Sequence, residues 1–342
     1  MPTARRCGLR VVLVSTIVLA FTGTVLAFQA ERTPSRFDAL ATGDPSASLD
    51  VAPQRPDELP LGDPARAQWD DFRAENNGPW SVVLDRRSGA PLLVEGRGIP
   101  WIAGSGNSLP PGPAPTLESL EASLRRFIAG HRAVLLADDG ELVLNRQASG
   151  RLAPETWQVV FDRQIGGVPV AGERYLFVIG HGNLISFGAP RWGRFHASLQ
   201  PAIDVADGRR RLLDYMSIPQ GAVSEILRDG DLLYLPRRAS EAAGPYRGAV
   251  GAGYEATLVR VYALRVSGEP GTWVGYVDAR SGSIVGFFDD NQYAQVKGGV
   301  LPVSNDGLCP DGCEQASYPM PYADIQGAVS YTHLTLPTIL RV

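Results

Sequence analysis

Apolar and polar residues alternate through residues 156–187, which read TWQVVFDRQIGGVPVAGERYLFVIGHGNLISF. A period of two residues is typical of a β-strand that buries one face. The apolar positions on that face are Trp157, Val159 and Phe161 before the pair Gly166–Gly167, and Tyr175, Phe177 and Ile179 after it. Glycine supplies the positive φ that tight turns need, so this segment is predicted to form an antiparallel hairpin.

A strand–turn–strand phrase recurs along the chain. WSVVLDRRSGAPLLV begins at Trp80 and WVGYVDARSGSIVGFF begins at Trp273, and both contain Asp-x-Arg-Ser-Gly. The segment YLFVIGHGNLISF is a looser third copy, and the three turns contain Gly89, Gly282 and Gly182. Because the copies are unevenly spaced, they indicate repeated hairpins and not a solenoid.

Two helices are expected among the strands. The first spans Thr116 to Leu135, with Thr116 as its N-cap and apolar residues at helical spacing. The second spans about Asp204 to Met216, although Gly208 weakens the helical pattern. Mostly antiparallel strands follow each helix, and the second set includes a predicted turn at Asp229–Gly230. The fold class is therefore predicted as α+β, with two helix-plus-antiparallel-sheet units.

The N-terminal segment has the features of a secretory signal peptide. Three arginines precede the apolar run VVLVSTIVLAFTGTVLA, so we expect residues 1–27 to be cleaved after Ala27 and the protein to be secreted by bacterial export. A membrane anchor is the alternative, since the run approaches the ~20 residues that span a bilayer. Threonine and glycine dilute its hydrophobicity and favour removal, which leaves no stable membrane anchor. Residues 28–65 are rich in Pro, Asp, Ala and Ser and are predicted to be a disordered lead-in.

The last residues differ sharply in composition from those before them. Residues 329–342, VSYTHLTLPTILRV, resemble translated sequencing-adapter read-through, and a genuine C-terminal strand is the alternative. We favour the artefact and expect the natural protein to continue past residue 328.

The net charge and the missing catalytic motifs argue against several classes of function. A net charge of −4 gives no sign of nucleic-acid binding, and the run Arg209–Arg211 is interpreted as a solvated helix face. The HExxH signature of zinc hydrolases is missing, and His131, His181 and His196 have no partner at metal-ligand spacing. Ser105, in AGSGN, lacks the strand and helix of a nucleophile elbow.

Two acidic clusters do not change this conclusion. Asp138–Asp139–Gly140 and Asp289–Asp290–Asn291 are interpreted as turn and strand-end residues, with a calcium site as the weaker alternative. The sequence therefore predicts no catalytic, cofactor-binding or metal residue in this part of the chain, and no enzyme activity.

The central motif resembles a known propeptide family. RQIGGVPVAGERYLFVIGHGNLISF is similar to the hallmark of the fungalysin/thermolysin propeptide domain. The matching positions are Gly167, Pro169, Val170, Gly172 and 182–184. The helix that precedes it also lies where that family has one. The resemblance implies a propeptide unit over residues 66–200.

A second motif resembles the closing strands of a PepSY-type unit. WVGYVDARSGSIVGFFD contains an apolar strand, V-D-A-x-[ST]-G and a second apolar strand, with matches at Val277, Asp278, Ala279, Ser281 and Gly282. Similar hairpins occur in unrelated PepSY proteins. The resemblance implies a PepSY-like unit over residues 201–292. Residues 293–328 would then be a linker and the start of a following domain.

Together these resemblances imply the pro-region of a secreted zinc metallopeptidase precursor, a zymogen. The region would act as an intramolecular chaperone and inhibitor, with the catalytic domain of its own precursor as its partner. The chain departs from the family in lacking the protease, which we attribute to truncation, so zinc is expected only in the missing catalytic domain. The alternative is a stand-alone secreted PepSY-like module that binds or inhibits a separate protease.

Cys309 and Cys313, in CPDGC, are predicted to form a disulfide. The Pro-Asp-Gly turn brings them together, an exported chain meets an oxidising environment, and a zinc site would need further ligands. Such a small loop should stabilise the protein by about 2 kcal/mol. Non-reducing mass spectrometry of the secreted protein should find the pair oxidised, and two free thiols would contradict the prediction.

Overall fold

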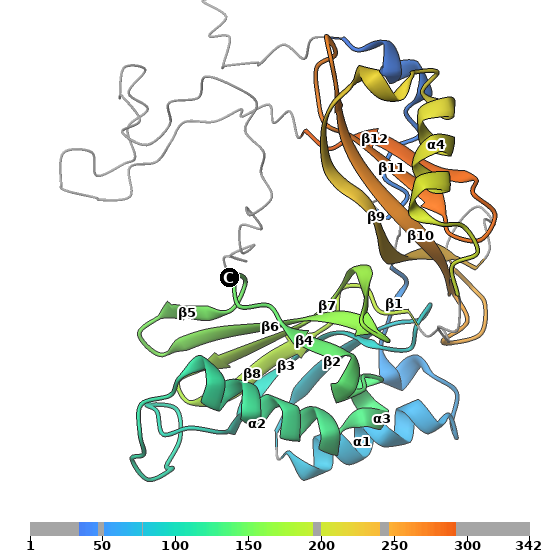
Figure 1. The fold of residues 1–342 in the computed structure, drawn as a ribbon. Coiled ribbons are helices and arrows are strands. Elements are labelled where there is room, and N and C mark those ends of the chain that lie inside the picture. Colours follow the sequence, from blue (N-terminus) through green and yellow to red (C-terminus); the bar gives the residue numbers. More distant parts are fainter. Residues whose placement is uncertain (1–33, 47–50, 77, 194–199, 240–245, 292–342) are drawn as a thin grey trace, which may run out of the picture. The chain divides into compact units, whose positions relative to one another are not determined.

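Among the described residues, mostly antiparallel strands form the larger part of the regular secondary structure, and α-helices pack against them (Figure 1). The computed structural model describes residues 34–46, 51–76, 78–193, 200–239 and 246–291, all within one compact unit. The strand order there is β1-β2-β3-β8-β7-β9-β10-β11-β12, with β6 beside β7 and both β4 and β5 beside β6. The fold class is α+β, as the sequence predicted.

The elements have the following bounds. The strands are β1 (Pro53–Gln54), β2 (Trp80–Asp85), β3 (Pro91–Pro100), β4 (Leu142–Leu144), β5 (Gly150–Ala153), β6 (Thr156–Ile165), β7 (Val168–Gly180), β8 (Asn183–Gly188), β9 (Val223–Arg238), β10 (Tyr254–Val266), β11 (Trp273–Asp278) and β12 (Ile284–Asp289). The α-helices are α1 (Pro64–Glu75), α2 (Leu117–Gly130), α3 (Arg132–Leu135) and α4 (Val205–Tyr215). The 3₁₀-helices are η1 (Arg36–Leu40), η2 (Pro56–Glu58), η3 (Asp139–Glu141) and η4 (Gln220–Ala222).

The hairpin of β6 and β7 has the predicted register. The inward side chains lie directly opposite one another in the pairs Trp157–Ile179, Val159–Phe177 and Phe161–Tyr175. Apart from Trp157, which is partly buried, these side chains are fully buried. The alternation of the sequence therefore specified both the pairing and the buried face.

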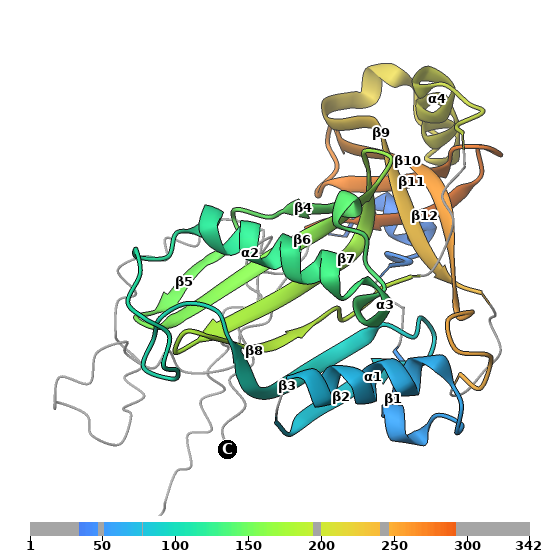
Figure 2. The same ribbon diagram turned by 90° about the horizontal axis from the view of Figure 1, so that it is seen from below.

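Helices α1, α2 and α3 cover the buried face of this first half of the sheet (Figure 2). The core they share with the strands includes Trp69, Phe72, Leu124, Ile128, Phe177 and Phe187. Thr116 caps α2 as predicted, with its hydroxyl accepting from the backbone N–H of Ser119. The predicted helix is interrupted at His131, and α3 forms a separate short turn after it.

The second half of the sheet packs on α4 (Figure 1). Asp204 caps this helix, and its span, Val205–Tyr215, lies within the predicted range of about Asp204 to Met216. A Cβ atom at Gly208 would lie 2.2 Å from the hydroxyl of Tyr262, so the glycine that weakened the helical pattern allows the helix to approach the sheet closely. That hydroxyl donates to the carbonyl of Val205 at 2.8 Å, at the start of the same helix.

A bulge in β7 connects the two halves into one large sheet. Gln164 pairs with Pro169 and Asp162 pairs with Arg174, so β7 has more residues than β6 between the two pairs. Val170, within this bulge, pairs in parallel with Tyr234 of β9. The prediction of two separate small sheets was wrong, because the bulge turns the backbone of β7 toward a strand that lies far away in the sequence.

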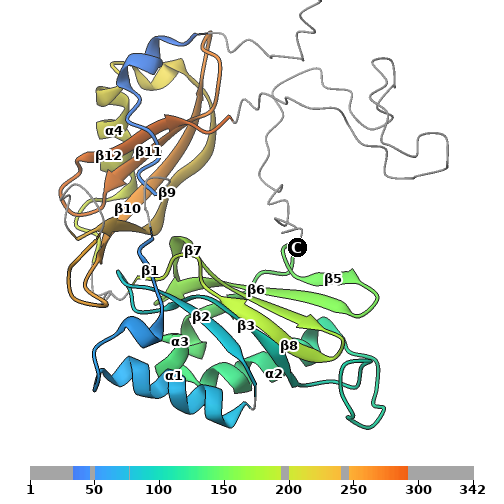
Figure 3. The same cartoon turned by 180° about the vertical axis from the view of Figure 1, so that it is seen from behind.

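The predicted disordered lead-in also needs correction for its described residues, 34–46 and 51–65. Phe37 of η1 is buried against Trp273 and Phe287, with ring centroids 5.4 and 6.5 Å away. The N–H of Thr42 donates to the carbonyl of Phe287, and this segment follows the sheet edge (Figure 3). Few apolar residues are enough here, because distant strands supply the surface that buries them.

Asp229–Gly230 is not a turn between two strands. Strand β9 continues through it, with Asp229 opposite Tyr262, Asp231 opposite Val261 and Gly230 between them as the extra residue of a bulge. Gly230 has φ +82°, so the positive φ that indicated a hairpin turn serves a bulge in this strand.

The central position of Phe177 gives a stability prediction. Phe177→Ala removes a fully buried ring and should lower the free energy of unfolding by about 3–5 kcal/mol, because a cavity replaces its contacts. Leu152→Ala is the control, since Leu152 is 57% exposed, and it should change stability by at most about 0.5 kcal/mol. Urea unfolding measures both, and similar losses for the two variants would contradict the assigned core.

Candidate functional site

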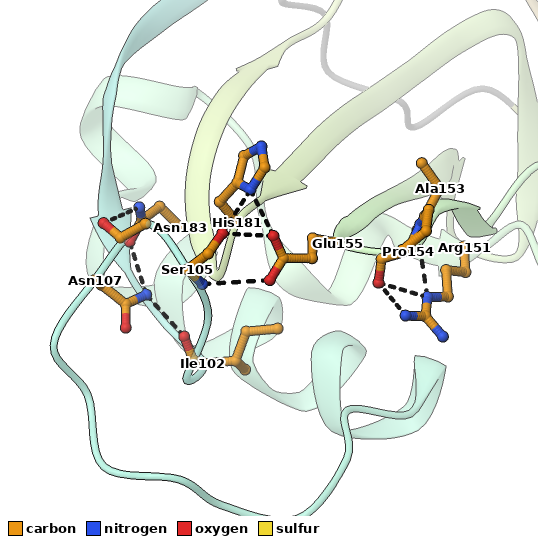
Figure 4. A network of polar contacts seen from close by, with 10 residues as sticks. Ile102, Ser105, Asn107, Arg151, Ala153, Pro154, Glu155, His181 and Asn183 are labelled. Carbon is orange, nitrogen blue, oxygen red and sulfur yellow. Dashed lines mark hydrogen bonds and ion pairs between the residues drawn. The ribbon is translucent and has the colours of Figure 1, made fainter.

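Three loops meet at one end of the first half of the sheet (Figure 4). They are residues 101–107 after β3, Pro154–Glu155 between β5 and β6, and His181–Gly182 between β7 and β8. We call these three segments the sheet tip. The figure shows a network of polar contacts that joins the three segments, so the sheet tip is the candidate site.

Strand register brings these loops together. Thr156 pairs with Gly180, which places Glu155 beside His181, and the N–H of His181 donates to the carbonyl of Glu155 at 2.9 Å. Pro100 pairs with Asn183, so the chain after β3 continues along the β7–β8 turn. The residues that follow it donate two backbone hydrogen bonds, of 3.0 and 3.1 Å, to the carbonyl of Gly182.

Two Gly-x-Gly-Asn motifs, residues 104–107 and 180–183, pack against each other at the sheet tip. The side-chain amide of Asn107 donates to the side-chain oxygen of Asn183 at 3.0 Å. Asn183 in turn donates to the carbonyl of Gly106 at 3.0 Å, and the N–H of Gly106 donates to the carbonyl of His181 at 2.9 Å. Each motif therefore satisfies polar groups of the other.

The glycines permit this close approach. A Cβ atom at Gly104 would lie 2.5 Å from the carbonyl oxygen of His181. At Gly182, which has φ +85°, a Cβ atom would lie 2.4 Å from the carbonyl oxygen of Ile102. Both distances are too short for a side chain, so the backbones of the two motifs touch directly.

Ser105, Glu155 and His181 form a side-chain cluster on the surface of the tip (Figure 4). The Nδ1 atom of His181 lies 2.7 Å from Oε2 of Glu155 and 2.8 Å from the hydroxyl of Ser105. The serine hydroxyl also contacts the same carboxylate oxygen. Hydrogen bonds from Ser105 first, and then from His181, lower the pKa of Glu155 below its ordinary value.

This cluster has the residue types of an acyl-transfer triad but not its geometry. In a triad, one ring nitrogen of the histidine takes the proton of the serine while the other nitrogen binds the carboxylate. Here both partners meet Nδ1, and the other ring nitrogen points away from Ser105 (Figure 4). An ionised carboxylate can only accept, so Nδ1 and the serine hydroxyl both donate to Glu155. The side chains of His181 and Glu155 are 65% and 43% exposed. The hydrogen bonds of the cluster connect the three loops to one another.

Sequence reasoning found part of this site. It placed His181 in a turn, which is confirmed, and it treated Ser105 separately. It missed Glu155 and the two asparagines, although the repeated Gly-x-Gly-Asn pattern was visible. His131 lies at the C-terminal end of α2, and its ring packs on Phe127 with centroids 4.3 Å apart.

The other candidate residues lie elsewhere. Asp138 caps η3, which begins at Asp139, and β12 ends at Asp289, just before Asp290 and Asn291. In the described ranges, no three His, Cys, Asp or Glu side chains are grouped so that they could hold a metal, and no helix has the length and hydrophobicity to cross a membrane. Four residues named in the sequence analysis lie outside those ranges: Ala27, His196, Cys309 and Cys313. What the sequence predicts for them is therefore still a prediction.

Comparison with known proteins assigns no family. No protein-family model matches the chain, and no curated protein matches it. One solved structure, the C-terminal domain of YpeB from Bacillus megaterium, aligns with 14% sequence identity over 63% of this chain and 78% of that chain, with a TM-score of 0.28. A likeness at that TM-score supports no functional conclusion.

The contact between the two motifs can be tested with glycine variants. Gly182→Ala should lower the free energy of unfolding by about 3 kcal/mol, because it combines positive-φ strain with displacement of residues 101–107. Gly167→Ala is the matched control: its φ is +80°, but nothing lies within 4 Å of the added Cβ, so about 1 kcal/mol is expected. Urea unfolding of both variants measures the difference, and equal losses would show that the motif contact contributes little.

Proposed function

We propose that residues 66–292 are the pro-region of a secreted zinc metallopeptidase precursor, which binds the catalytic domain, assists its folding and keeps it inactive until the pro-region is removed. The proposal takes its protease class from the sequence resemblance to the propeptide domain. It also takes this part of the chain to have no catalytic activity of its own.

The observation that carries the binding role is the construction of the sheet tip. The side chains of Ser105, Glu155 and His181 are exposed, yet the backbone of the tip is held by the hydrogen bonds between residues 101–107 and 181–183. A surface that is already ordered loses less conformational entropy when it binds a partner. The polar groups of the tip serve this rigidity, since Ser105 and His181 both donate to Glu155.

Two of the residues on which the resemblance rests also shape this fold. Val170 lies in the bulge that pairs with β9, and Gly182 lies in the tip. Such residues set the shape of a surface, which is what an inhibitory module requires. Inhibition would follow from burial of an interface of ordinary size, roughly 1,600 Å² in total, that excludes substrate from the protease cleft.

The gene provides the first test. Its sequence past codon 328 should encode a domain with an HExxH motif. A complete gene without such a domain would remove the precursor hypothesis, and the stand-alone module acting on a separate protease would become the better account.

The second test uses the encoded protease. Co-expression with this chain should raise the yield of active enzyme, and adding the purified chain to active enzyme should inhibit it until the chain is digested. Glu155→Ala combined with His181→Ala should weaken inhibition severalfold, while Glu255→Ala, an exposed residue of β10, should not. Equal folding without the chain and an unchanged rate at micromolar concentration would contradict the proposal.

A further inference from the structure

A buried ion pair holds the backbone of Gly193. Arg163 of β6 and Glu173 of β7 are joined by a 2.7 Å bond from Nη1 to Oε2, and their side chains are 6% and 1% exposed. The other carboxylate oxygen of Glu173 accepts the N–H of Gly193 at 2.7 Å. The same Nη1 of Arg163 donates to the carbonyl of Gly193 at 2.6 Å. Side chains thus bind both backbone groups of one residue, as a neighbouring strand would.

Arg163 has other partners that keep it in place. Its Nε and Nη2 atoms both lie 2.8 Å from a carboxylate oxygen of Glu141 in η3. Its guanidinium carbon lies 4.4 Å from the ring centroid of Trp192, whose indole N–H donates to the carbonyl of Leu136 at 2.9 Å. Because these contacts do not involve Glu173, the guanidinium should stay in position when the charge of Glu173 changes.

The charges around Glu173 are unbalanced. One guanidinium, Arg163 of β6, faces two carboxyl groups, Glu173 itself and Glu141 of η3. A further titratable neighbour in the described part of the chain is the buried phenol of Tyr175 on β7, which donates to the carbonyl of Leu135. Burial raises the pKa of Tyr175 well above its ordinary value, so it stays neutral. A proton on Glu173 makes the three-group cluster neutral.

Burial is the largest cause that raises the pKa of Glu173, to about 7, and the negative charge of Glu141 raises it further. The charge of Arg163 and the bonds from Arg163 and Gly193 oppose this rise. The carboxyl group therefore changes its charge near neutral pH. Each oxygen already accepts one N–H, and a neutral carboxyl group is a weaker acceptor than a carboxylate, so protonation weakens the bond from the N–H of Gly193.

We propose that Glu173 is a pH-operated latch, which holds the N–H of Gly193 firmly as a carboxylate and weakly when protonated, while Arg163 keeps the carbonyl of Gly193. The latch lies where the chain leaves the first half of the sheet, after β8, and it stands independently of the proposed function. It makes the contact between Glu173 and Gly193 respond to pH without a metal or a ligand.

The latch and the global fold respond to pH with opposite signs. In the unfolded chain Glu173 has its ordinary pKa of 4.5, and in the folded chain about 7. Its contribution to stability is therefore fully present below pH 4.5 and is lost as the pH rises through about 7. The local contact with the N–H of Gly193 instead tightens as the pH rises, because the charged carboxylate is the stronger acceptor.

NMR of the whole chain between pH 5 and pH 9 tests the proposal. The carboxyl ¹³C signal of Glu173 should titrate near pH 7, and the amide signal of Gly193 should shift with the same midpoint. Between pH 8 and pH 6 the carboxylate population should fall from about nine-tenths to about one-tenth, and the hydrogen-exchange protection factor of Gly193 should fall severalfold with it.

Three variants make the test specific. Glu173→Gln should abolish the pH response of Gly193, and Glu141→Gln should move the response to lower pH by removing the second carboxylate. Glu255→Gln, on the exposed surface of β10, should leave the response unchanged. If Glu173→Gln does not fold, the shift caused by Glu141→Gln still decides the question. The proposal would be overturned if the carboxyl signal of Glu173 titrated with a midpoint near pH 4.5. It would also be overturned if the amide signal of Gly193 did not change over the titration of Glu173.

Discussion

Burial of the face shared by β6 and β7 is the constraint on which the rest of the structure depends. The aromatic and branched side chains of this hairpin lie opposite one another and under α2, so their register cannot slip without exposing the core. The same register decides what happens outside the core. It places Glu155 beside His181 at one end of the hairpin, and it places Arg163 near the bulge of β7 at the other.

Polar side chains in this fold mostly satisfy the backbone at places where the strand pairing stops. Asn107 and Asn183 bond across two loops that have no ladder between them. Arg163 and Glu173 bind the N–H and carbonyl of Gly193 after the last strand of the first half. Buried or crowded backbone groups need such partners, because an unpaired group costs free energy. The two sets differ in charge: the asparagine pair is neutral, whereas the second set contains a carboxyl group whose pKa is raised to about 7.

That difference bears on function. A rigid exposed tip is suited to contact with another protein, and the precursor hypothesis gives it a partner in the catalytic domain. A buried titrating carboxyl group is suited to an internal response, and it acts on the chain's own backbone. The cluster of Ser105, Glu155 and His181 shows why residue types alone do not establish catalysis, since both hydrogen-bond partners share one ring nitrogen.

The sequence by itself determined the local elements: the hairpins, the cap at Thr116, the helix after Asp204 and the α+β class. Each depends on a period, a cap or a turn that lies within about 20 residues of chain. It did not reveal the order around Phe37, the bulge at Gly230 or the junction of the two halves at Val170, and it treated Ser105 and His181 separately. Only the tertiary structure decided these features, because each depends on a surface or a strand that a distant segment supplies. A pattern of neighbours along the chain records which face a residue occupies, but not which distant backbone will meet that face.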